Sequence, residues 1–159
     1  MSLEKIDAII DALRHERYRW TPGRRTYVPK PNGKRRPLGL PTWSDTLLQE
    51  VLRSIWDASY EPQFSHHSHG FRPDRGGHTA LRDGRQHGRA TKWLIAGALS
   101  ACFDRIDHAV REAILPERLH DNRFLRLRRG LLQAGYVEEG IFHPTHSGVP
   151  QGGVVSFQG

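Results

Sequence analysis

Basic residues gather around one tight turn in the first quarter of the chain. The turn Pro31-Asn32-Gly33 has cations on both sides. They are Arg24, Arg25, Lys30, Lys34, Arg35 and Arg36. Guanidinium groups pair with phosphate oxygens through two parallel hydrogen bonds, whereas an ammonium acts as a compact point charge. The clustering therefore favours contact with phosphate groups; a solvated basic surface in an arginine-rich chain is the alternative.

Histidines form a second group with possible chemistry. His66, His67, His69 and His78 lie close together in the sequence, and Zn²⁺ can use three imidazole nitrogens as ligands. The His-Glu-x-x-His spacing of many zinc enzymes is missing, however. A loop of solvated or backbone-bonded histidines is the favoured interpretation, and no metal ligand is predicted.

The composition excludes several classes of protein. The 159 residues include 24 Lys and Arg against 17 Asp and Glu, and this net charge of +7 favours a nucleic-acid partner. Cys102 is the single cysteine, so a disulfide scaffold and a cysteine-based zinc site are excluded. Apolar runs are far shorter than the roughly 20 residues that cross a bilayer, and no secretory signal follows Met1. We therefore expect a cytoplasmic, nucleic-acid-associated protein with no membrane partner.

Alternating helix and strand patterns must position these residues. A hairpin is predicted over residues 24–40, followed by a helix from Trp43 to about Ala58 whose cap Thr42 and Asp45 share. Further on, Asp121 is expected to cap a helix that Gly135 ends. The other expected elements are a helix after residue 2, a loop over 60–75, a helix over 78–85, a mostly buried strand over 93–100, a helix over 107–115 and a strand or hairpin over 136–143. This mixture predicts an α+β fold with helices packed on a small antiparallel sheet.

Six segments follow one another in a specific order and spacing. They are Arg24–Pro41, Trp43–Trp56, Tyr60–Ser65 with His69–Arg75, Cys102–His108, Arg123–Tyr136 and Gly148–Gly153. Together they resemble the reverse transcriptases encoded by group II introns, which are RNA-directed DNA polymerases and also act as intron maturases. The resemblance implies the fingers and an incomplete palm of a right-hand polymerase, with residues 1–90 as a fingers-like region and residues 91–159 as a partial palm.

The resemblance also implies a nucleotide site. It places Lys30 and Arg36 at the triphosphate of an incoming deoxynucleoside triphosphate, Phe103 beside the sugar and Gln151 against the nucleotide. Judged from the residues alone, the two cations can equally be solvated, Phe103 can be a core aromatic and Gln151 can belong to a turn.

Nucleic-acid contacts are expected from four arginines. They are Arg24 and Arg25 in the hairpin and Arg72 and Arg75 in the loop that follows, and the implied partners are an RNA template or intron RNA and a DNA primer. For Arg72 and Arg75, a structural role that braces their own loop is about equally plausible.

One position departs from the family pattern. The family carries an aspartate five residues before the aromatic at position 103 and uses it to bind Mg²⁺, which prefers oxygen ligands. Here that position is Ala98, and Ala96 stands where an acidic residue is also common. Asp104 and Asp107 match other positions, and Asp107 is best interpreted as a helix cap. No catalytic residue is therefore expected to be intact, and Mg²⁺ is not expected to bind this chain.

The family pattern continues beyond the last matching segment. It reaches a Tyr-Ala-Asp-Asp hairpin that supplies further metal ligands, and this sequence contains no Asp-Asp pair. We therefore expect a truncated member of a family that copies RNA into DNA during intron mobility and splicing, inactive by itself. A non-catalytic RNA- or DNA-binding remnant and a decayed reading frame without function are the alternatives.

Overall fold

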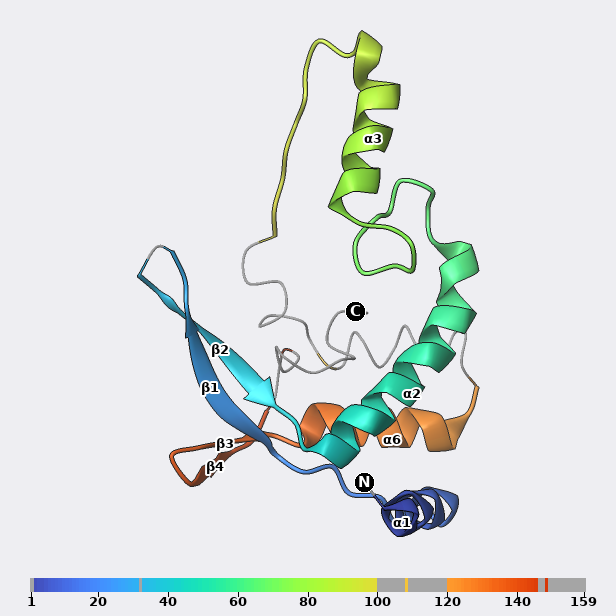
Figure 1. Cartoon of the computed structure of the whole chain (residues 1–159), viewed down its shortest axis with the longest axis vertical. Coiled ribbons are helices and arrows are strands. Elements are labelled where there is room, and N and C mark those ends of the chain that lie inside the picture. Colours follow the sequence, from blue (N-terminus) through green and yellow to red (C-terminus); the bar gives the residue numbers. More distant parts are fainter. Residues whose placement is uncertain (1, 32, 100–107, 109–119, 146–147, 149–159) are drawn as a thin grey trace.

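The computed structural model describes residues 2–31, 33–99, 108, 120–145 and 148. Within these ranges a helix is followed by a pair of strands, a run of helices and a second pair of strands (Figure 1). The elements are α1 (Leu3–Arg14), β1 (Gly23–Pro29), β2 (Arg35–Leu40), α2 (Trp43–Tyr60), η1 (Glu61–Gln63), α3 (Gly77–His87), η2 (Gly88–Ala90), α6 (Asn122–Gln133), β3 (Tyr136–Glu138) and β4 (Ile141–His143). The predicted α+β class is confirmed, whereas the helix expected over 107–115 lies almost entirely outside the described residues.

One four-stranded sheet has the order β2-β1-β3-β4. β1 and β2 form the predicted hairpin, and the positive φ of Gly33 (76°) allows its tight turn. β3 and β4 form a second antiparallel pair, whereas β1 and β3 run parallel and place Gly23 opposite Tyr136. The sheet is therefore mixed and not wholly antiparallel as predicted, because its central pairing joins two parallel strands that are far apart in the sequence.

The core lies where α2 crosses α6 (Figure 1). Leu48, Leu52 and Trp56 follow one another at four-residue spacing on α2 and are buried. Phe124 and Leu127, with Leu131 from the same helix, pack against them, and the Trp56 and Phe124 rings meet edge to face at 5.8 Å. This helix pair forms the hydrophobic core of the described residues.

Predicted caps define the ends of both core helices. Thr42 Oγ1 accepts a hydrogen bond from the backbone N–H of Asp45 at the start of α2. Asp121 Oδ1 accepts from the N–H groups of Arg123 and Phe124 at the start of α6. Gly135, with φ of 71°, follows the end of α6 and turns the chain into β3. These predictions are confirmed.

The segment between α1 and β1 is attached to both core helices. Trp20 Nε1 donates to the Leu127 carbonyl oxygen at 2.7 Å, and Tyr18 donates to Asp45 at 2.8 Å. Glu16 forms ion pairs with Arg123 and Arg126 of α6. The segment that follows the N-terminal helix is therefore joined to the core by contacts between residues more than 100 positions apart in the sequence.

The predicted buried strand over residues 93–100 is wrong for the part that the structure describes. Residues 93–99 form no strand, and Trp93, Leu94, Ile95 and Leu99 are between 84% and 96% exposed. An apolar run becomes a buried strand only where another strand pairs with it and another layer covers it. No described strand pairs with these residues.

Among the described helices, none combines the length and the apolar character needed to cross a membrane.

Candidate nucleic-acid and nucleotide interface

The hairpin divides its cations between two faces. Val28 lies opposite Arg36, and the backbone N–H of Lys30 donates to the Lys34 carbonyl oxygen at 2.7 Å, which extends the antiparallel pairing to the turn. Side chains alternate along a strand, so this register puts Arg24, Lys30 and Arg36 on one face. All three are exposed. The structure thus brings both residues expected at the triphosphate to the same face as Arg24.

Side chains on the opposite face of the hairpin contact side chains of the neighbouring strand β3. The guanidinium of Arg25 lies 3.7 Å from the centre of the Tyr136 ring, within the range of a cation–π contact. Tyr27 donates a hydrogen bond to Glu138, and this bond raises the pKa of Tyr27. Arg35 lies 4.9 Å from the Tyr27 ring. Arg25 and Arg24 are therefore neighbours in the sequence with different surroundings, because Arg25 takes part in the sheet packing.

Arg72 lies inside its own loop. Its Nε and Nη2 donate to the Glu61 carboxylate at distances from 2.8 to 3.1 Å, and its Nη1 donates to the carbonyl oxygens of Ser65 and Ser68 at 2.8 Å. The side chain is 6% exposed, and its hydrogen bonds lower the pKa of Glu61. Arg72 therefore has the structural role in its own loop that the sequence analysis gave as an alternative. Contact of Arg72 with nucleic acid stays a prediction.

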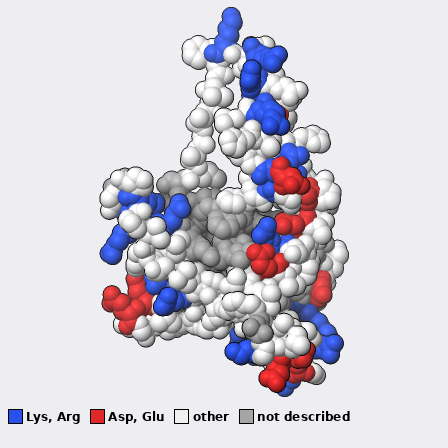
Figure 2. All heavy atoms as spheres, viewed as in Figure 1, with Lys and Arg blue, Asp and Glu red and all other residues white. Residues whose placement is uncertain are grey.

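Arg75 also takes part in holding this loop. Its Nη1 donates to the carbonyl oxygen of His66, and the Ser68 carbonyl oxygen lies 3.5 Å from the same nitrogen. Figure 2 shows Lys and Arg side chains over the hairpin and along α3. Basic surface is thus present on both elements, while a nucleic-acid role for Arg75 stays a prediction.

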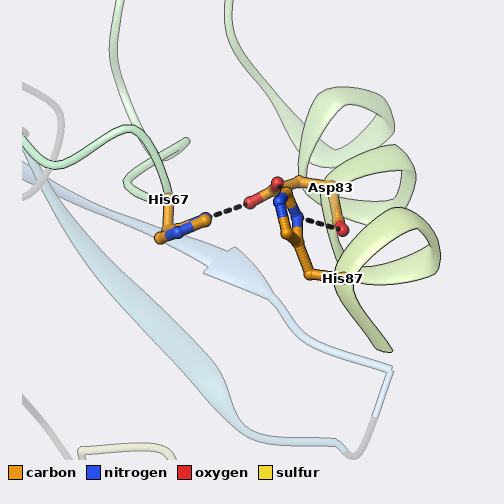
Figure 3. A group of neighbouring side chains, drawn as sticks. All are labelled: His67, Asp83 and His87. Carbon is orange, nitrogen blue, oxygen red and sulfur yellow. Dashed lines mark hydrogen bonds and ion pairs between the residues drawn. The ribbon is translucent and has the colours of Figure 1, made fainter. Parts of the chain in front are cut away.

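Three side chains that can ligate a metal meet on α3 and the loop before it (Figure 3). Asp83 Oδ2 lies 2.7 Å from His67 Nδ1, and Asp83 Oδ1 lies 2.8 Å from His87 Nδ1. His69 Nε2 is 3.2 Å from Asp83 Oδ2. Hydrogen bonds from His67 and His69 lower the pKa of Asp83 to about 2. This carboxylate is therefore held in its charged form by the rings around it.

Sequence reasoning found only part of this histidine cluster. It singled out His67 and His69 but missed Asp83 and His87. The available signal was their spacing of four residues on one helix, which places both on the same face. The predicted end of that helix at residue 85 left His87 outside it, whereas α3 continues to His87.

Residues 93–99, which include Ala98, carry no ligand for the Mg²⁺ that the family pattern implies. Ala98 is exposed, and residues 93–99 carry apolar side chains or glycine, so none offers a side-chain oxygen to a hard cation. Phe103, Asp104, Asp107 and Gln151 lie outside the described residues. His108 Nε2 donates to the Gly148 carbonyl oxygen at 2.6 Å, so these two residues lie together although they are 40 positions apart.

Comparison with known proteins gives this arrangement a family context. The family model described as reverse transcriptase (RNA-dependent DNA polymerase) matches residues 28–157. Group II intron-encoded protein LtrA of Lactococcus lactis subsp. cremoris is 42% identical over 156 residues, which cover 98% of this chain and 26% of LtrA. The uncharacterized 91 kDa protein in the cob intron of Schizosaccharomyces pombe is 43% identical over 98% of this chain and 19% of its own length. Protein YkfC of Escherichia coli K12 is 36% identical over 96% of this chain and 41% of its own length.

The chain therefore spans less than half the length of each of these curated relatives. The matched range contains β2, α2, α3, α6, β3 and β4, and it begins inside β1. The resemblance to group II intron-encoded proteins is confirmed, and the chain belongs to the reverse transcriptase (RNA-dependent DNA polymerase) family.

Proposed function

We propose that this chain forms the part of a group II intron reverse transcriptase that binds the RNA template, the DNA primer and the incoming deoxynucleoside triphosphate. In this proposal residues 1–90 are fingers-like and residues 91–159 belong to the palm. The observation that carries the proposal is the shared face of Arg24, Lys30 and Arg36, which are exposed on a two-stranded hairpin.

A hairpin face suits the binding of phosphate groups for a physical reason. Phosphoryl transfer depends on positioning and on cations that are already in place when charge develops. The antiparallel pairing fixes the backbone beneath Lys30 and Arg36, so only their side chains must adapt to the triphosphate. The packing of Arg25 over Tyr136 and of Tyr27 against Glu138 holds the opposite face of the hairpin.

We propose further that the chain does not catalyse nucleotide transfer. Two-metal phosphoryl transfer needs carboxylates that hold both ions close to the reacting oxygens. Ala98 replaces the expected aspartate, and residues 93–99 offer no substitute oxygen. The proposal therefore has two parts, binding of the substrates and absence of catalysis, and a different experiment tests each part.

A binding titration tests the first part. Binding of a fluorescently labelled deoxynucleoside triphosphate to the chain, in the presence of an RNA template annealed to a DNA primer, is titrated at several salt concentrations. Substituting both Lys30 and Arg36 by Ala should weaken binding about tenfold and reduce the salt dependence by about one to two released ions. Arg35→Ala is the matched control, because it removes a cation from the opposite face of the same strand and should have the smaller effect.

Either of two results would overturn the binding proposal. One is an equal loss of affinity in the control and in the double variant. The other is no binding of the intact chain at low salt, which would support a remnant without function. The catalytic part is tested by primer extension with Mg²⁺ or Mn²⁺: no template-dependent product is expected, and any such product disproves the assignment of inactivity.

A further inference from the structure

We propose that His67, Asp83 and His87 bind one divalent transition-metal ion of the zinc class. The potential ligand atoms of these three residues all lie within 4.8 Å of one another. Among the described residues, this group places two imidazole rings and one carboxylate next to one another. The site lies on α3 and the preceding loop, separate from the hairpin cations, so it does not depend on the proposed nucleic-acid function.

Helix geometry places two of the ligands together. Asp83 and His87 are four residues apart on α3 and therefore lie on the same face, one turn from each other. The third residue, His67, comes from the loop between η1 and α3 and approaches the carboxylate from the other side (Figure 3). Each imidazole uses Nδ1, and each contacts a different oxygen of Asp83. Each oxygen of the carboxylate thus already contacts one of the two rings, whose centres lie 5.2 Å apart.

A second layer of contacts orients the carboxylate. His69 is largely buried, and its Nε2 lies 3.2 Å from Asp83 Oδ2 while its Nδ1 lies 2.9 Å from Thr79 Oγ1. Thr79 Oγ1 in turn accepts from the backbone N–H of Gly76 at the start of α3. Such outer partners commonly fix the orientation of metal ligands. His69 would act as a positioning residue.

The loop that carries His67 is held independently of any ion. Arg72 donates to the backbone carbonyls of Ser65 and Ser68, which flank His67 in the sequence. The His67 backbone N–H also bonds to the Ser65 hydroxyl at 3.2 Å. The backbone position of His67 is therefore defined before an ion arrives, and rotation of its exposed ring is the main change that binding requires.

The donor set determines the class of ion. Two imidazole nitrogens and one carboxylate oxygen suit Zn²⁺, Co²⁺, Ni²⁺ and Cu²⁺, whereas Mg²⁺ and Ca²⁺ prefer sites made entirely of oxygen. At ligand distances of about 2.0 Å, tetrahedral coordination brings donor atoms to roughly 3.3 Å from one another. The side chains of His67 and His87 are 64% and 62% exposed, so both can make this adjustment. Three protein ligands leave the fourth position open to water.

Isothermal titration of the intact chain with ZnCl₂ in a non-chelating buffer tests the site. One ion per chain is expected, and Co²⁺ should give the visible absorption bands of tetrahedral coordination. His67→Ala and His87→Ala should each weaken Zn²⁺ binding at least tenfold, in line with the loss of one of three ligands. His78→Ala is the matched control, because it removes an exposed histidine of α3 that is not in the group and should leave the affinity unchanged.

Circular dichroism of each variant checks that the helices are retained. If an alanine variant loses helix, Asp83→Asn provides the comparison with nearly unchanged shape, and it too should weaken binding at least tenfold. The proposal is overturned if the intact chain binds no Zn²⁺ at millimolar concentration, if the His78 control loses as much affinity as the His67 variant, or if Asp83→Asn keeps full affinity. If the intact chain binds nucleic acid but no Zn²⁺, the metal site is rejected while the proposed nucleic-acid function stands.

Discussion

The hydroxyl of Tyr18 donates a hydrogen bond of 2.8 Å to Oδ1 of Asp45, in the first turn of α2. The carboxylate is 2% exposed, and it also accepts from Thr42 Oγ1 at 2.6 Å and from the backbone N–H of Thr21 at 3.3 Å. One buried charge therefore satisfies three donors from two segments of the chain. It joins the strand entry at residues 18–21 to the helix that carries most of the core.

Replacing Asp45 by Ala should lower the free energy of unfolding by about 2–3 kcal/mol. The substitution removes the acceptor of three hydrogen bonds and leaves two hydroxyl groups without it. Tyr18→Phe removes one donor and should cost only about 1 kcal/mol. Urea unfolding followed by tryptophan fluorescence measures both values. Equal losses in the two variants would show that the shared carboxylate is not the source of the stability.

Tyr18 should also make the fold sensitive to alkaline pH. Burial, followed by the hydrogen bond and negative charge of Asp45, raises the pKa of Tyr18. The unfolded chain loses this proton near pH 10, whereas the folded chain keeps it to higher pH. The stabilisation is therefore complete below about pH 10 and decreases as the pH rises further. Urea midpoints at pH 8 and pH 10.5 should differ more for the intact chain than for Tyr18→Phe, and identical differences would contradict this assignment.

Gly135 and Gly140 provide a matched pair of substitutions. Both have positive φ angles, 71° and 84°, so an alanine at either site costs about 1 kcal/mol in backbone strain. A Cβ at Gly140 meets nothing within 4 Å, whereas a Cβ at Gly135 lies 2.5 Å from the His143 carbonyl oxygen and 2.6 Å from the Phe142 ring. Gly135→Ala should therefore cost about 1–3 kcal/mol more than Gly140→Ala. Thermal unfolding of the two variants measures the difference, and a pair of equal values would exclude close packing at Gly135.

Arg72 and Arg24 should respond differently in a nucleic-acid binding assay. Arg24→Ala removes an exposed cation from the hairpin and should reduce the salt slope by about one ion. Arg72→Lys keeps a charge but cannot reproduce the paired contacts with Glu61, so it should loosen the loop over residues 61–75. Faster amide hydrogen exchange in that loop with an unchanged salt slope is the expected result. Weaker nucleic-acid binding by the Arg72 variant, with unchanged hydrogen exchange in the loop, would instead support direct phosphate contact.

Local chemistry explains why much of the fold was predictable. Thr42 and Asp121 cap their helices through bonds to backbone N–H groups two or three residues away, and Gly135 ends α6 because it tolerates a positive φ. The hairpin turn depends in the same way on the residues at 31–34. Each of these signals acts over a few residues, so its outcome can be derived from the sequence alone. The family assignment likewise depended on ordered segments that are visible in the sequence.

Predictions were less accurate for residues whose surroundings come from segments far away in the sequence. The apolar residues at 93–99 suggested a buried strand, but burial needs a second strand and a covering layer, and the described residues supply neither. Arg24 and Arg25 were predicted to act alike. The parallel pairing of β1 with β3 brings Tyr136 to Arg25 and leaves Arg24 exposed. Local sequence patterns do not show which strands will pair with each other in the sheet.

The sequence by itself determined the α+β class, the caps, the basic hairpin, the family and the alanine at position 98. The mixed order of the sheet, the contact between Arg72 and Glu61, and the proximity of His67 to Asp83 and His87 depend on the folded arrangement of the chain. The physical reason is the distance along the sequence between the residues that interact. Caps and turns are stabilised by hydrogen bonds between near neighbours, whereas a site assembled from a loop and a helix depends on how the chain closes over many residues.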